Sequence, residues 1–188
     1  GPFGTAIELA GEGETIEVPE LGLVFPTEVV TIVMWAKQGG TDNQDIFSLL
    51  PIDPERITCH MPWDNSISWQ FGQLGFAATM AFDEAWIGEW KHWAFVSHFN
   101  QDRDQKYMAI FLDGVEEKHL GKLASKFLPR FASFHIGGRP DSSYDGSIDE
   151  FGIFEAALSE TDVGNIMNGG LARAALHQSV DPSGKATT

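Results

Sequence analysis

The sequence predicts an all-β protein: a two-sheet antiparallel β-sandwich of the jelly-roll type, with one short helix near the C-terminus. Runs rich in β-branched and aromatic residues recur at intervals of roughly 8 to 12 residues, which is typical of sandwiches and jelly rolls. Glycines are frequent, 20 in 188 residues, and fit many tight turns. Only one segment has apolar residues at convincing helical spacing.

Strand-forming runs account for most of the chain. The expected strands are, in order, 5–11, 14–20, 29–37, 45–51, 56–63, 65–72, 89–99, 106–112, 115–121, 131–138 and 146–154. The clearest hairpin is 106–121, because Asp113-Gly114 lies between two strand-like runs and such pairs favour two-residue turns. Residues 38–45 (QGGTDNQD) are expected to form a loop.

The expected helix begins after Ser159, a good N-cap residue, with Asp162 in the position of a capping box. Val163, Ile166 and Met167 lie on one helical face, and Asn168-Gly169-Gly170 is expected to end the helix. Residues 172–180 fit either a closing strand or a short helix. We expect one domain over residues 3–180 and a linker at 181–188 to a further segment, with Gly1-Pro2 as a cloning remnant.

The composition and net charge of the chain limit the classes of binding partner. The formal net charge of −15 disfavours binding to nucleic acid or to an anionic membrane surface, because no basic field attracts phosphate. No apolar run approaches the ~20 residues that span a bilayer, so membrane insertion is not expected. The single cysteine, Cys59, excludes an intrachain disulfide and a cysteine-based zinc site, and is expected to be structural.

Several motifs together resemble laminin-G-like domains of the concanavalin A-like jelly-roll family. They are GTAIELAGEGETIEVP (4–19), VVTIVMWAK (29–37), WKHWAFVSHFNQDRDQKYMAIFLDGVEE (90–117) and YDGSIDEFGIFEAALSETDV (144–163). The resemblance spans roughly residues 4–172. It implies a binding or adhesion module of secreted or surface proteins, often with calcium. Many members have an Asp before the glycine of the first hairpin, where this chain has Ala10.

Asp149 and Glu150 are adjacent carboxylates in an otherwise apolar strand. Successive strand residues face opposite sides, so Asp149 is expected to share a face with Phe151 and Ile153, and the two carboxylates should not converge on a substrate. A retaining glycosidase needs two carboxyl groups ~5 Å apart. The Glu-x-Asp-x-Glu pattern of related glucanases and the Gly-x-Ser-x-Gly elbow are both absent. The sequence therefore predicts no enzymatic activity.

A carboxylate on an apolar face needs a partner. One hypothesis is a structural Ca²⁺ held by Asp149 and by Glu8 in the opening strand, with backbone carbonyls completing the coordination. The alternative is that Asp149 accepts backbone N–H bonds from a neighbouring loop. A second acidic group, Asp42, Asp45, Asp141 and Asp145, matches no EF-hand spacing and is expected to form solvated loops at one end of the sandwich.

The tryptophans suggest a ligand site. Trp63 and Trp69 flank Asp64 and Asn65, and sugar binding needs such a mixture of flat rings and planar polar groups. The alternative is that these rings cap an edge of the sandwich. Trp35 and Trp90 are expected in the core, and Trp93 lies on the opposite strand face from Trp90. His92 is expected to be a hydrogen-bonded structural residue, whereas nothing selects His60 or His135 for ligand binding.

The sequence thus predicts a noncatalytic recognition module of a bacterial exported or cell-surface protein, binding carbohydrate through an aromatic-bearing face or end loops. The alternative function is a protein-interaction or spacer domain with no small-molecule ligand. Fold alone does not decide between them.

Overall fold

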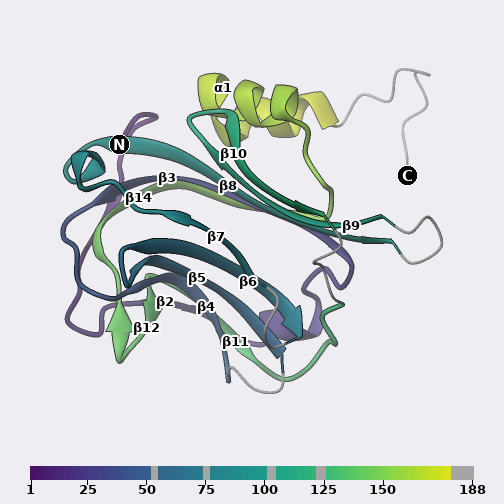
Figure 1. Cartoon of the computed structure of the whole chain (residues 1–188), viewed down its shortest axis with the longest axis horizontal. Helices are drawn as coiled ribbons and strands as arrows, with labels where there is room; N and C mark the ends of the chain where they lie inside the picture. The colour runs from purple at the N-terminus through teal and green to yellow at the C-terminus, as the bar shows by residue number, and fades with distance from the viewer. Residues whose placement is uncertain (52–54, 74–76, 101–104, 122–125, 179–188) are drawn as a thin grey trace.

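The computed structural model is a sandwich of two six-stranded antiparallel sheets, which confirms the predicted fold class (Figure 1). The structure describes residues 1–51, 55–73, 77–100, 105–121 and 126–178. The expected linker at 181–188 lies outside the described residues. The first strand, β1 (Ile7–Ala10), pairs with the last one, β14 (Asp145–Phe154), in one sheet.

The two six-stranded sheets are called sheet A and sheet B. In spatial order, sheet A contains β1 (Ile7–Ala10), β14 (Asp145–Phe154), β3 (Val29–Gln38), β8 (Trp90–Asn100), β9 (Gln105–Leu112) and β10 (Val115–Gly121). Sheet B contains β2 (Ile16–Val18), β11 (Ser133–Ile136), β4 (Asp45–Leu50), β5 (Glu55–Trp63), β6 (Ser66–Gln73) and β7 (Ala77–Ala81). A small hairpin, β12 (Gly138–Arg139) with β13 (Ser142–Ser143), precedes β14. Two 3₁₀ helices, η1 (Leu21–Leu23) and η2 (Glu84–Trp86), lie in connections.

The core lies between the sheets and follows from strand alternation. Phe47 of β4 contacts rings from both sheets, with ring centroids 5.7 Å from Trp69 and 5.8 Å from Phe95. All three side chains are fully buried. Burying such a side chain stabilises the fold by roughly 1.5–3 kcal/mol, so this aromatic layer is a main source of stability.

Helix α1 (Glu160–Gln178) lies on the outer face of sheet A (Figure 1). The predicted capping box is present: the Asp162 N–H donates to Ser159 Oγ at 3.2 Å, and the Ser159 N–H donates to Asp162 Oδ2 at 3.0 Å. The buried side chains of Val163 and Ile166 pack over Val33, Val96 and Phe111 of the sheet. Among the described residues, no helix is long and apolar enough to cross a bilayer.

The helix does not end where the sequence predicts. Gly170 has a left-handed φ of 72°, so the chain kinks there and then continues as helix to Gln178. The Glu150 carboxylate accepts the Leu171 N–H and thereby caps the second helical segment. The stop predicted at Asn168-Gly169-Gly170 is therefore a kink, and residues 172–178 are helical rather than a strand.

A β-bulge in β14 explains how two adjacent carboxylates fit this strand. Asp149 lies opposite Trp35 while Gly152 lies opposite Val33, so the register shifts between them. Glu150 occupies the shift with a left-handed φ of 52°. Alternation is interrupted, and Ile148 and Phe151 both pack against the core. The prediction that Asp149 shares a face with Phe151 is wrong, because the bulge adds one residue to the strand.

The structure also corrects the placement of the tryptophans. Trp93 is the buried core ring of β8. Trp90 lies on the outer face, where Lys37 Nζ is 5.6 Å from its ring centroid. Trp35 is half-buried on the outer face and contacts His92 edge-to-face at 5.4 Å. The expectation that Trp35 and Trp90 are core residues is wrong, since positions 30, 32, 34 and 36 of β3 face inward.

His92 is buried on the outer face of sheet A, at 1% exposure. Its Nδ1 has no hydrogen-bond partner among the described residues, so the expectation that His92 is hydrogen-bonded is wrong for this atom. Burial lowers the pKa of His92 to about 4, and the nearby Asp113 carboxylate only partly opposes that shift. The imidazole is therefore neutral in the folded protein at neutral pH.

We predict that His92 contributes to acid sensitivity. Its folded pKa lies below the ordinary value of 6.5, so protonation below pH 6.5 favours the unfolded chain. Stability should fall between pH 7 and pH 4 by about 3 kcal/mol through this residue alone. Urea unfolding of His92→Gln should show a pH dependence reduced by that amount, whereas His119→Gln, which changes an exposed histidine, should not. An unchanged pH dependence in His92→Gln would contradict the prediction.

Candidate functional site

A buried carboxylate organises one end of the sandwich. Asp45 begins β4, has no exposed side-chain surface, and lies opposite His60 of β5. Its Oδ1 pairs with His60 Nδ1, and its Oδ2 accepts from Arg139 Nε at 2.5 Å and from Ser48 Oγ at 3.2 Å. The expectation that Asp45 belongs to a solvated loop is wrong, because Asp45 pairs with His60 of β5 and its carboxylate is buried against Arg139.

These partners compensate the desolvation of the Asp45 carboxylate, which is costly unless the charge is paired. Arg139 arrives from the β12–β13 hairpin, 94 residues further along the chain. The Asp45 charge also affects Cys59, which is fully buried. Burial is the main cause that raises the pKa of the Cys59 thiol well above its usual range, and the Asp45 carboxylate is the second. A protonated, inaccessible thiol fits the structural role predicted for Cys59.

Two of the Asp45 partners position Trp63, which is half-buried at the end of β5. The His60 ring lies 4.9 Å from the Trp63 ring, and the Arg139 guanidinium carbon lies 5.8 Å from its centroid. Such a cation–π contact is worth about 0.5–1 kcal/mol at an exposed site. The indole is thus held by side chains that the buried carboxylate fixes in turn.

The turn after Trp63 connects this ring to the neighbouring loop. Asp64 and Asn65 have left-handed φ values of 49° and 57°, as a two-residue hairpin turn requires. The Asp64 N–H donates to Asn43 Oδ1 at 2.8 Å, and Asn43 Nδ2 donates back to Asp64 Oδ1 at 3.4 Å. The Asn65 carbonyl accepts the Phe82 N–H at 2.9 Å. Trp63, Asp64 and Asn65 therefore form one surface with Asn43.

Trp69 does not belong to this surface. Its side chain is fully buried, and its Nε1 donates to the Val96 carbonyl at 3.0 Å in the middle of the core. The prediction that Trp69 binds ligand is corrected, because it lies on the inward face of β6 with Ile67 and Phe71.

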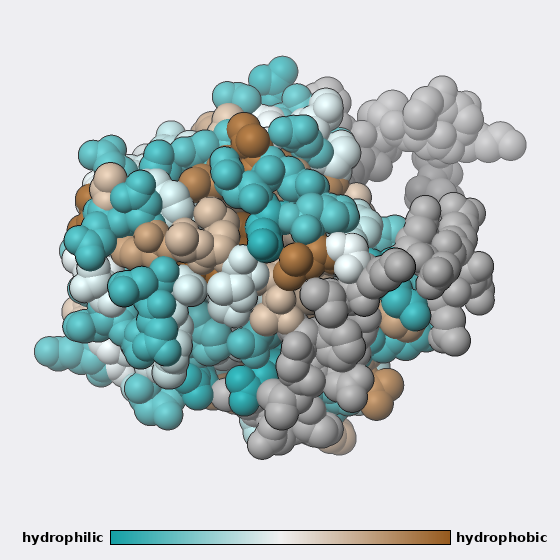
Figure 2. Space-filling view, viewed as in Figure 1, coloured by the Kyte–Doolittle hydropathy of each residue, from teal (hydrophilic) through white to brown (hydrophobic). Residues whose placement is uncertain are grey.

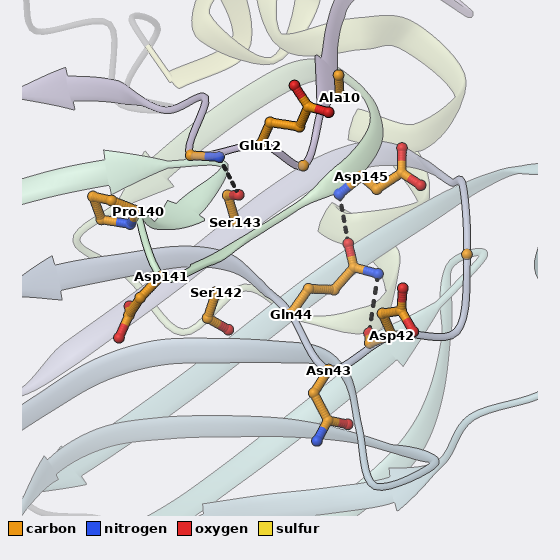
Figure 3. Close-up of a pocket in the computed structure, with 13 residues that line it drawn as sticks. Ala10, Glu12, Asp42, Asn43, Gln44, Pro140, Asp141, Ser142, Ser143 and Asp145 are labelled. Carbon is orange, nitrogen blue, oxygen red and sulfur yellow. Dashed lines mark hydrogen bonds between the residues drawn. The ribbon is translucent and has the colours of Figure 1, made fainter.

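Beside Asn43 lies an open cleft of about 410 Å³ (Figure 3). We call it the acidic cleft. Its lining is polar and comes from three loops that are distant in sequence: Ala10, Gly11, Glu12, Gly13, Gly40, Asp42, Asn43, Gln44, Pro140, Asp141, Ser142, Ser143 and Asp145. Two elements contact both the cleft and the Trp63 region. Asn43 lines the cleft and bonds to Asp64, and the β12–β13 hairpin lines the cleft and carries Arg139, which contacts the Trp63 ring.

Internal hydrogen bonds fix the walls of the cleft (Figure 3). The buried Gln44 accepts the Asp145 N–H at 2.5 Å and donates from Nε2 to the Asp42 carbonyl at 3.2 Å. Ser143 Oγ accepts the Gly13 N–H at 2.8 Å. Ser142 is buried, and its Oγ has no hydrogen-bond partner among the described residues. The cleft therefore offers preformed hydroxyl and amide groups.

Glu12, Asp42, Asp141 and Asp145 bring four carboxylates to the lining. Arg139 offsets them only weakly, since its Nε is 3.9 Å from Asp141 Oδ1 and is already bonded to Asp45. Figure 2 shows hydrophilic side chains over much of one face of the sandwich, with apolar side chains exposed between them. An anionic ligand would meet repulsion here, whereas a neutral, hydroxyl-rich ligand would not.

The structure places the proposed calcium residues, Glu8 and Asp149, on adjacent strands of sheet A. Glu8 is exposed and pairs with Ser147, two residues before Asp149. Asp149 accepts the Phe3 N–H at 3.2 Å and the Glu150 N–H at 2.9 Å, which agrees with the alternative that it binds backbone donors. Within the described ranges, no three His, Cys, Asp or Glu residues form a metal-binding group. Calcium stays a prediction.

The sequence did not identify Arg139, His60, Asn43 or Gln44 as site residues. Arg139 and Asn43 carry no local signal, because only the fold brings their loops to Trp63. A signal for Trp69 did exist: Ile67, Trp69 and Phe71 alternate with Ser66, Ser68 and Gln70, which predicts that the tryptophan faces the core.

Comparison with known proteins identifies relatives of this fold. The family model Laminin_G_3, described as the concanavalin A-like lectin/glucanases superfamily, matches residues 10–164. Domain 4 of AbnA, a GH43 extracellular arabinanase from Geobacillus stearothermophilus solved in complex with arabinotriose, is 24% identical with a TM-score of 0.67, covering 89% of this chain and 78% of that chain. No curated protein gives a significant sequence match.

Two further structures are similar at lower identity. The heptameric SAP-like pentraxin from Limulus polyphemus is 13% identical with a TM-score of 0.58, covering 76% of this chain and 71% of that chain. Domains LG4-5 of the mouse laminin alpha1 chain are 12% identical with a TM-score of 0.62, covering 82% and 44%. At these identities the likeness establishes the fold alone.

We predict that Asp45 is a major contributor to stability. Asp45→Asn should lower the free energy of unfolding by about 3 kcal/mol, because it leaves Arg139 without the charge that compensates it. Urea denaturation followed by tryptophan fluorescence measures this loss. Asp141→Asn, at a side chain that is 80% exposed, should change stability by less than about 1 kcal/mol. Equal effects of the two substitutions would contradict the role of the buried carboxylate.

Proposed function

The chain belongs to the concanavalin A-like lectin/glucanases superfamily, and from that membership and its site we propose that it is a noncatalytic carbohydrate-recognition module of an exported or cell-surface protein. One observation carries the proposal. An indole, Trp63, is held by groups bonded to a buried carboxylate, and the turn that follows it bonds to Asn43, which lines a polar cleft.

The chemistry of the site suits a sugar. A flat aromatic ring can stack on the apolar face of a pyranose or furanose, and convergent amides and hydroxyls can bond its hydroxyl groups. Asn43 and Ser142 line the cleft and bring an amide and a hydroxyl to it, and Asn43 also bonds to the turn after Trp63. Because the indole and the loops are preorganised, little conformational entropy is lost when a ligand binds.

Three carboxylates outside the acidic cleft have structural partners, which supports binding without hydrolysis by these groups. Asp149 and Glu150 both accept backbone N–H groups, and Asp45 is buried and paired with Arg139. Each therefore has a structural task. A glycosidase instead needs an available acid and a second carboxylate, held ~5 Å apart in retaining enzymes and at most ~9.5 Å apart in inverting ones.

The charge of the cleft favours neutral glycans over sialylated, sulfated or uronic-acid glycans. Arabino-oligosaccharides are the first ligands to test, since the similar AbnA domain was solved with arabinotriose. Export to the cell surface or medium is part of the proposal, because extracellular glycans are found there.

We predict that Trp63→Ala weakens the binding of a neutral oligosaccharide at least tenfold, because burial of an aromatic face contributes roughly 1.5–3 kcal/mol. Isothermal titration calorimetry with arabinotriose measures the change, preceded by a glycan array if arabinotriose does not bind. Trp90→Ala is the matched control, since Trp90 lies on the outer face of sheet A.

Undiminished binding by Trp63→Ala would place the ligand elsewhere. If no glycan on the array binds, the proposal fails and the alternative is favoured, namely a protein-interaction or spacer domain. Turnover of a polysaccharide would overturn the noncatalytic part of the proposal.

We also propose that Glu8 and Asp149 hold a structural Ca²⁺ together with backbone carbonyls. If so, millimolar CaCl₂ should raise the melting temperature, because a ligand that binds only the folded state stabilises it. Asp149→Asn should abolish the increase, whereas Asp83→Asn, at an η2 cap on the β7–β8 connection, should retain it. A melting temperature that does not respond to calcium would reject the site.

A further inference from the structure

A second, smaller cavity lies between the two sheets, close to the turn that carries Trp63. Its floor is formed by buried side chains of both sheets, and its mouth by half-buried or exposed ones. The lining residues are Ala36, Gln38, Met61, Phe82, Trp86, Glu89, Lys91, Trp93 and Tyr144. The cavity volume is about 10 Å³, which is the space of one oxygen-sized group.

Two polar atoms of the floor have no hydrogen-bond partner among the described residues. They are Gln38 Oε1 and Tyr144 Oη, from side chains that are 5% and 0% exposed. Gln38 donates from Nε2 to the Gly40 carbonyl at 2.9 Å, which fixes its amide and leaves Oε1 as the unused atom. Buried polar groups are rarely left unsatisfied, so two of them in one cavity indicate an intended partner.

The chemistry of these atoms selects that partner. Gln38 Oε1 can only accept a hydrogen bond, and the Tyr144 phenol can donate one. Burial, with the Asp145 carboxylate beside it, raises the pKa of Tyr144 well above its usual range, so the phenol keeps its proton. A hydroxyl group can accept from Tyr144 and donate to Gln38 at once. A carboxylate can accept from Tyr144 but cannot donate to Gln38 Oε1.

The walls suit the carbon atoms of a sugar. Trp86 contacts Phe82 and Trp93 edge-to-face, with centroid distances of 5.7 Å and 5.5 Å. Phe82 is tied to the Trp63 turn, because its N–H donates to the Asn65 carbonyl at 2.9 Å. The aromatic walls and the Trp63 surface therefore belong to the same end of the sandwich.

We propose that this cavity is a hydroxyl-binding subsite, which takes one hydroxyl oxygen of the neutral glycan bound at Trp63 between Tyr144 and Gln38. The inference rests on the proposed function and adds a specificity element to it. It gives the buried amide of Gln38 and the phenol of Tyr144 a hydrogen-bonding partner.

Tyr144→Phe tests the subsite, since it removes only the hydroxyl and leaves the ring in place. Calorimetric titration with arabinotriose should give a dissociation constant about tenfold higher than that of the wild type, the effect of one lost hydrogen bond. The melting temperature should not fall, because no protein hydrogen bond is broken. Tyr107→Phe, on the outer face of sheet A, should bind as the wild type does.

Equal affinities of wild type and Tyr144→Phe, with Trp63→Ala still defective, would overturn the subsite and leave the proposed function standing. If the wild type binds no glycan, a crystal structure with ethylene glycol decides the subsite separately. A hydroxyl oxygen within hydrogen-bond distance of both Tyr144 Oη and Gln38 Oε1 would support it. A direct bond between those two atoms, or only a water that the diol does not displace, would overturn it.

Discussion

The pairing of the buried Asp45 carboxylate with Arg139 and His60 is the constraint on which the candidate site depends. A buried charge is tolerated only with close partners, so β5 and the β12–β13 hairpin must approach β4 at this point. The same two partners contact the Trp63 ring. A requirement of folding thereby holds the proposed recognition surface.

A second constraint shapes the opposite sheet. The bulge at Glu150 allows two adjacent carboxylates to leave the core, and each then satisfies a backbone donor, at Phe3 for Asp149 and at Leu171 for Glu150. These bonds attach the N-terminal residues and the second segment of α1 to sheet A. These two adjacent carboxylates are thus structural elements of sheet A.

The sequence predicted the sandwich, the Asp113-Gly114 hairpin and the capped helix, because each depends on local pattern and turn chemistry. It did not predict β7, whose Ala-Ala-Thr-Met-Ala run has little β-propensity and is held by pairing with β6. Within the candidate site, Trp63 and Asp64 were identifiable, because an aromatic residue stands beside planar polar ones in this stretch of the sequence. Arg139 was not, because its partner Asp45 lies 94 residues away and no local pattern records such a contact.

A crystal structure of the protein with arabinotriose, or with the best neutral glycan from an array, tests the central claim most directly. Our account predicts a sugar ring stacked on Trp63, hydroxyl groups bonded to Asn43 or Ser142 in the acidic cleft, and Arg139 still paired with Asp45. A glycan bound on another face, with Trp63 and the cleft untouched, would contradict it.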